Sequence, residues 1–167
     1  MTRTVAQTFT LNGILGALGL PDQPFLTSPT QSLLSIIILV SWVGVGYWMM
    51  FLIAGLKDIP YSTYEAAAID GAGWWRTFFR ITLPQLRRPL LFVLVADTVA
   101  NFMVFAPVEI LTGGGPEGST NLIMFDTYQR AYVTGDLPAA AAETFILLGI
   151  ALTVVWIQFR LLPKGDD

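Results

Sequence analysis

A run of 25 residues without a charged side chain, Ser32–Leu56, restricts this chain more than any other feature of its sequence. At 1.5 Å per residue, a helix of this length is roughly 37 Å long and crosses a hydrocarbon core of about 30 Å with some tilt. Charged residues make up 13% of the chain, against about 25% in a typical soluble domain. The sequence therefore predicts an all-α membrane protein.

Two more apolar segments follow this first one. Pro89–Leu111 is apolar except for Asp97, Asn101 and Glu109, and Ala139–Leu162 carries Glu143 near its start. We expect three transmembrane helices, with a cytoplasmic helix-turn-helix between the first and the second. The expected division is an outer or interfacial segment 1–31, a span 32–56, a polar elbow 57–88, a span 89–111, an outer loop 112–138, a span 139–162 and a cytoplasmic tail 163–167.

Basic residues predict the orientation of the chain. Seven of the nine lie in the elbow or at the C-terminal end: Lys57, Arg76, Arg80, Arg87, Arg88, Arg160 and Lys164. Only Arg3 and Arg130 lie in the other segments. Because loops rich in Lys and Arg stay inside, the elbow and the C-terminus are predicted to be cytoplasmic.

The chain has no cysteine and no histidine. Their absence excludes disulfides, thiol catalysis and histidine-based acid–base or zinc chemistry. We expect no catalytic residue, no metal, no cofactor and no nucleic-acid partner. The apolar piece Leu11–Leu20 could also be the core of a signal peptide, but its length and three glycines favour a loop or interfacial segment.

The elbow has the pattern of two short helices. Ser62 and Glu65 have the spacing of a capping box, which predicts a first helix over Thr63–Ile69. Asp70-Gly71 is expected to end it, because glycine tolerates the left-handed conformation. A second, aromatic helix is predicted over Trp74–Thr82, with Pro84 breaking it. By this pattern alone, a docking element and a simple surface helix remain equal alternatives.

The spacing of three short motifs favours the docking element. Glu65-Ala66-Ala67, Asp70-Gly71-Ala72 and Ile81-Thr82-Leu83-Pro84 resemble the EAA signature of ABC importer permeases, without an insertion between them. The later stretch Leu111-Thr-Gly-Gly-Gly-Pro116, with Ser119-Thr120, resembles the outer loop of the carbohydrate group, which includes maltose and glycerol-phosphate permeases. Within that group the chain resembles the first permease subunit of the pair.

The resemblance implies a pore-forming subunit whose elbow docks on a nucleotide-binding ATPase subunit. It implies docking roles for Glu65, Ala66, Ala67 and Gly71, with Asp70 capping the turn. A second permease and an extracytoplasmic solute-binding protein are the further implied partners, in a bacterial or archaeal cytoplasmic membrane. The sequence contains no P-loop, which agrees with ATP hydrolysis in a separate subunit.

The chain is shorter than the permeases that it resembles. Such permeases usually have six spans or more, and this sequence predicts only the last three. A fragment, a misassigned start and a truncated gene are the three explanations that we consider.

Polar residues inside the second span have two interpretations. Asp97 and Asn101 are four residues apart and therefore share one helix face. Polar groups at membrane depth usually face a cavity or a partner, so the pair could line a substrate pathway or bond to a neighbouring helix. Glu109 and Glu143 are expected to be solvated or interfacial. Packing is the expected role of the aromatic residues Phe102, Phe105, Tyr128 and Tyr132.

The sequence thus predicts a sugar or polyol permease subunit of an ABC importer. An ABC permease for amino acids, peptides or ions is one alternative, which the Thr-Gly-Gly-Gly-Pro loop disfavours. A membrane structural or assembly protein that does not transport is another. An enzyme is the least favoured, because no catalytic constellation is visible.

Overall fold

The structure is a computed structural model that describes residues 11–161, and these residues form helices and loops without a strand. The helices are α2 (Leu11–Ala17), α3 (Ser32–Lys57), α4 (Tyr61–Ile69), α5 (Trp74–Thr77), the π-helical turn η1 (Phe78–Thr82), α6 (Leu83–Gln85), α7 (Arg87–Phe102), α8 (Ala106–Leu111), α9 (Ile123–Tyr128), the π-helical turn η2 (Gln129–Thr134) and α10 (Leu137–Leu161). The expected all-α fold is confirmed. The expectations for Arg3, Lys164 and the tail 163–167 lie outside the described residues.

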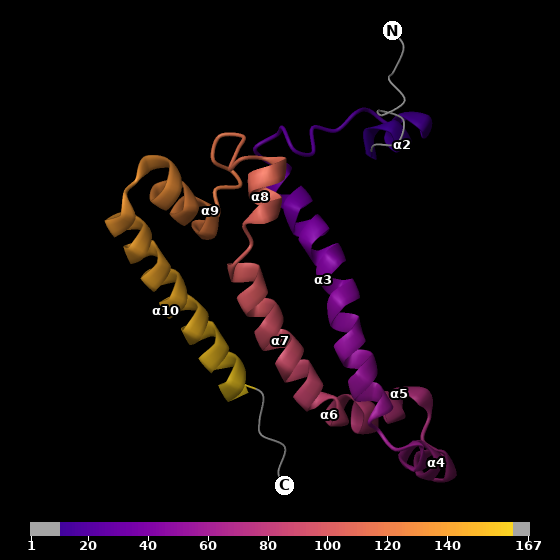
Figure 1. Cartoon of the computed structure of the whole chain (residues 1–167). Helices are drawn as coiled ribbons and strands as arrows, with labels where there is room; N and C mark the ends of the chain where they lie inside the picture. Colours follow the sequence, from indigo (N-terminus) through magenta and orange to yellow (C-terminus); the bar gives the residue numbers. More distant parts are fainter. Residues whose placement is uncertain (1–10, 162–167) are drawn as a thin grey trace.

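The three long helices lie side by side, with α7 between α3 and α10 (Figure 1). The elbow helices α4, α5 and α6 lie at one end of this layer, the same end at which α10 has its C-terminal end (Figure 1). The short helices α2, α8 and α9 lie at the opposite end. This arrangement places the elbow (57–88) and the loop 112–138, which keeps the name outer loop from its expected position, at opposite ends of the three helices.

Two helices, α3 and α10, are long and apolar enough to cross a membrane. Only 6% of the most apolar stretch of each is buried within the chain. The core helix of a soluble protein would be mostly buried, so these apolar faces need lipid or a partner helix to cover them. The first and third expected spans therefore correspond to α3 and α10, the latter beginning two residues earlier, at Leu137.

The second expected span is divided. A single helix was expected over residues 89–111, but α7 ends at Phe102 and α8 begins at Ala106. Pro107 explains the interruption, because it has no N–H to donate and its ring would clash with the carbonyl of Met103 in a continuous helix. The 16 residues of α7 span about 24 Å, less than a hydrocarbon core.

Glycines on α3 mark where this helix packs closely against α7. A Cβ on Gly55 would lie 2.6 Å from Pro89 Cγ, so α3 and the start of α7 approach each other closely there. Gly44 also faces α7, since its Cβ would lie 3.8 Å from Asp97 Oδ1, whereas Gly46 has open space around it. A small apolar cluster of Ile36, Val108 and Phe125 joins α3, α8 and α9 at the other end.

Candidate functional site

The first helix of the elbow begins at Tyr61, two residues before its expected start. Pro60 is its N-cap residue, with an extended ψ of 134°, and no side chain caps the helix. The Pro60 carbonyl accepts the Thr63 N–H instead. The predicted capping box between Ser62 and Glu65 is therefore wrong, because Ser62 already lies inside the first turn.

The end of α4 has the geometry that Asp70-Gly71 predicted. Gly71 has a φ of +69°, the left-handed conformation. The Ala72 N–H donates to the Ala67 carbonyl at 2.9 Å, and the Gly71 N–H donates to the Ala68 carbonyl at 3.1 Å. These two bonds are those of a Schellman motif, which satisfies the last carbonyls of a helix. Gly71 thus turns the chain sharply between the two halves of the elbow.

The elbow has one face against the chain and one face in solvent. Ala67 is buried, and the Tyr64 hydroxyl lies 3.3 Å from the Thr82 hydroxyl, which ties α4 to η1. On the opposite face Ile69 is 86% exposed, and Glu65, Ala66 and Asp70 are exposed beside it. The structure therefore brings the five predicted docking residues together on one short segment, with Glu65 and Ala66 accessible and Ala67 packed inward.

The second half of the elbow differs from the sequence-based expectation. Pro84 does not break the helix that begins at Trp74; the helical path continues through α6 to Gln85. The π-helical turn η1 precedes the proline, and its wide turn lets the Leu83 N–H reach the Phe78 carbonyl. Widening the turn ahead of Pro84 removes the steric conflict that a regular helix would have there.

A second set of polar groups lies between α3 and α7, away from the elbow. Trp48 Nε1 donates a hydrogen bond to Asp97 Oδ1 at 2.6 Å, and the Asn101 side-chain amide donates to the Asp97 carbonyl at 2.8 Å. Two adjoining hollows of about 270 and 550 Å³ share a lining of Val40, Gly44, Trp48, Asp97 and Asn101. The sequence identified Asp97 and Asn101 but not Trp48, whose partner is 49 positions away.

The outer loop is held by hydroxyl groups. The Thr112 and Thr120 hydroxyls lie 2.8 Å apart, and Thr120 also donates to the Gly115 carbonyl. Ser32, at the start of α3, lies 2.8 Å from the Ser119 hydroxyl. Ser32 and Thr120 are both fully buried. The loop that Thr-Gly-Gly-Gly-Pro predicted is therefore compact, and hydroxyl contacts hold it against the N-terminal end of α3.

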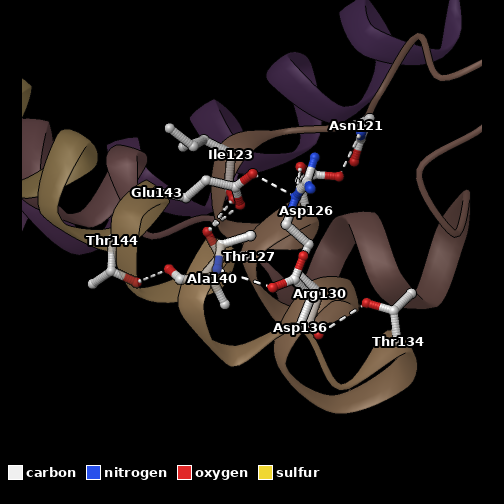
Figure 2. A network of polar contacts seen from close by, with 11 residues as sticks. Asn121, Ile123, Asp126, Thr127, Arg130, Thr134, Asp136, Ala140, Glu143 and Thr144 are labelled. Carbon is white, nitrogen blue, oxygen red and sulfur yellow. Dashed lines mark hydrogen bonds and ion pairs between the residues drawn. The ribbon is translucent and has the colours of Figure 1, made fainter.

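An ion-pair network ties the outer loop to α10 (Figure 2). Arg130 contacts Asp126 at 2.9 Å and also pairs with Glu143 on α10. Thr127 donates to Glu143 at 3.2 Å. Glu143 was expected to be solvated or interfacial, but it makes specific contacts that connect the outer loop to α10. Glu109 is exposed on α8.

The network predicts a small dependence of stability on pH. The hydrogen bond from Arg130, followed by that from Asn121, lowers the pKa of Asp126 below its usual value of 3.8. A lowered pKa in the folded state stabilises the fold above the unfolded value and loses that contribution as the pH falls through the folded pKa. We therefore expect Asp126→Asn to lower the melting temperature at pH 6, by no more than about 2 °C because the pair is partly exposed.

Thermal unfolding in detergent at pH 6 and pH 3 measures this difference. The difference in melting temperature between the wild type and Asp126→Asn is expected to be smaller at pH 3 than at pH 6. Glu117→Gln, at an exposed acid of the same loop, is the control and should shift neither melt. An equal difference at both pH values would contradict this assignment.

Together, the fold and these polar sites define a helical membrane protein with an accessible elbow at one end and a compact polar loop at the other. Its sequence identifies the family. Residues 5–165 match the model of the binding-protein-dependent transport system inner membrane component, and the chain belongs to this family.

Two characterised relatives are similar to this chain. The sn-glycerol-3-phosphate transport system permease protein UgpA of Agrobacterium fabrum is 36% identical over 93% of this chain and 53% of its own length. The maltose/maltodextrin transport system permease protein MalF of Escherichia coli is 37% identical over 87% of this chain and 31% of its own length. The chain therefore spans about half of one relative and about a third of the other.

The fold also resembles a solved structure. A bacterial ABC transporter involved in the import of the acidic polysaccharide alginate superposes with a TM-score of 0.74. The sequences are 22% identical, and the alignment covers 90% of this chain and 53% of the other. This likeness supports the fold alone.

Proposed function

We propose that this chain forms part of a permease subunit of an ATP-binding-cassette importer that moves a sugar or a related polyol across the cytoplasmic membrane. ATP hydrolysis in a partner subunit docked on the elbow drives the transport. The observation that carries the proposal is the exposed face of α4, where Glu65 and Ala66 lie just before the left-handed turn at Gly71, in a chain of the binding-protein-dependent family.

The shape of the elbow supports docking. On the exposed face of α4, Ala66 and Ala68 have small side chains, so a groove on a partner can approach the backbone closely there. Tyr64 and the Schellman bonds hold this segment in one conformation. Because this segment is already ordered, it loses little conformational entropy when a partner binds.

The membrane arrangement follows from the helices and the charges. We propose three crossings, made by α3, by α7 together with α8, and by α10. The basic residues Arg76, Arg80 and Arg87 lie in the elbow, so the elbow faces the cytoplasm. A second permease subunit covers the apolar faces that the chain leaves exposed, and a solute-binding protein delivers substrate at the outer end.

The hollow beside Asp97 and Asn101 is the proposed substrate pathway. It lies between two of the long helices and combines an apolar lining with a few polar atoms, which is typical of small-molecule sites. The relatives' names leave the charge of the cargo open, since glycerol phosphate and alginate are acidic and maltose is uncharged.

Reversing the charge at Glu65 tests the docking role. We expect Glu65→Lys to reduce co-purification of the cognate nucleotide-binding subunit at least about tenfold, because the exposed charge faces the partner. Glu117→Lys makes the same charge change at an exposed position of the outer loop and should leave co-purification unchanged. Equal capture by both variants would mean that the partner does not bind this face of α4.

A further inference from the structure

The hollow between α3 and α7 leaves two hydrogen-bond acceptors, one on Asp97 and one on Asn101, open to a substrate. Trp48 Nε1 is already bonded to Asp97 Oδ1, and the amide of Asn101 is bonded to the Asp97 carbonyl. Among the described residues, no partner is recorded for Asp97 Oδ2 or Asn101 Oδ1. A substrate that bonds to these two oxygens must donate hydrogen, as a sugar hydroxyl does and an anionic oxygen does not.

The charge of the lining points in the same direction. Asp97 is the only charged residue that lines either hollow, and neither lining includes a lysine or an arginine in the described part of the chain. Sites for phosphate or carboxylate groups normally supply such cations. The remaining lining is mostly aliphatic and aromatic, which weakens the screening of a carboxylate by solvent.

We propose that this hollow accepts an uncharged polyhydroxylated substrate and rejects anionic ones, and that Asp97 is the residue that makes this distinction. The proposal rests on the substrate pathway given under the proposed function. Trp48 fixes one oxygen of the carboxylate and leaves the other for a substrate hydroxyl. An anionic group at the same position meets the like charge of Asp97 and has no hydrogen to donate to its open oxygen.

The test compares two sugars that differ in charge. Binding of maltose and of maltobionate, which carries a carboxylate, is measured on the full-length chain in lipid nanodiscs through the fluorescence of its tryptophans, one of which lines the hollow. We expect maltose to bind the wild type at least about tenfold more tightly than maltobionate. Asp97→Asn keeps an acceptor for Trp48 Nε1 and should bring the two affinities within about threefold, by strengthening maltobionate binding.

Glu109→Gln is the matched control, since it removes an acid from α8 that does not line the hollow. It should leave the ratio of affinities unchanged. Equal affinities in the wild type, a ratio that Asp97→Asn does not alter, or no binding of either sugar to any variant would each overturn the inference.

The same preparations are assayed for capture of the nucleotide-binding subunit. Capture without charge discrimination would overturn this inference and leave the docking proposal standing. Discrimination without capture would leave the inference standing and remove the docking proposal.

Discussion

Replacing Gly71 with valine is expected to reduce capture of the nucleotide-binding subunit strongly while the membrane helices remain folded. Gly71 has a φ of +69°, a conformation that costs a β-branched residue about 1–3 kcal/mol. The chain can relieve this strain by giving up the Schellman bonds from Gly71 and Ala72. Either response moves Asp70 and the exposed end of α4, so we expect co-purification to fall at least about tenfold.

Gly73→Val provides the matched control, two residues away in the same turn. Gly73 has a φ of −69° and a ψ of 166°, which valine adopts readily, and its Cβ would meet nothing within 4 Å. Capture by this variant should equal that of the wild type. The melting temperature of both variants in detergent shows whether any loss is local. Equal capture by the two valine variants would contradict the role given to the turn.

Features set by neighbouring residues could be predicted from the sequence. The bounds of α3 follow from the charge-free run, because a charge at membrane depth is costly. The left-handed turn at Gly71 follows from the freedom of glycine after an apolar helix. The capping box failed because Pro60, one residue before Tyr61, already starts the helix. Two signals for a helix start thus competed within three residues.

Features set by distant residues could not be predicted. The bond between Trp48 and Asp97 joins positions 49 apart, and the tether between Arg130 and Glu143 joins the outer loop to α10. The close contact of Gly55 with Pro89 depends on how two helices cross. Hydropathy gives the length of an apolar helix, but not which face it turns to its neighbour.

The sequence contains a signal for the division of the second span, but the apolar composition of that span favours a single helix. The apolar run from Pro89 to Leu111 favours one helix by composition, and Pro107 within it favours a break. The structure has the break, between Phe102 and Ala106. Proline prevailed because its effect is steric and local, whereas an apolar composition is equally compatible with two shorter helices.

Replacing Gly114 with alanine is expected to destabilise the outer end of the molecule more than any other single methyl group added to the loop. A Cβ on Gly114 would lie 2.5 Å from Phe125 Cε1, and Gly114 has a φ of +81°. Phe125 is only 4% exposed and packs with Ile36 and Val108, so its ring has little room to move. Overpacking and strain together should cost about 2–4 kcal/mol.

Gly113→Ala separates the two contributions. Gly113 has a φ of +56° but open space at its Cβ, so it carries the conformational strain without the clash, at a cost of about 1 kcal/mol. Thermal unfolding of both variants in detergent measures the difference. Adding Phe125→Leu to Gly114→Ala should recover part of the loss, since leucine lacks the ring atoms that the new methyl group meets. Such recovery is a coupling between the two positions, whereas strictly additive losses would show that the left-handed backbone of Gly114, and not its contact with Phe125, limits the loop.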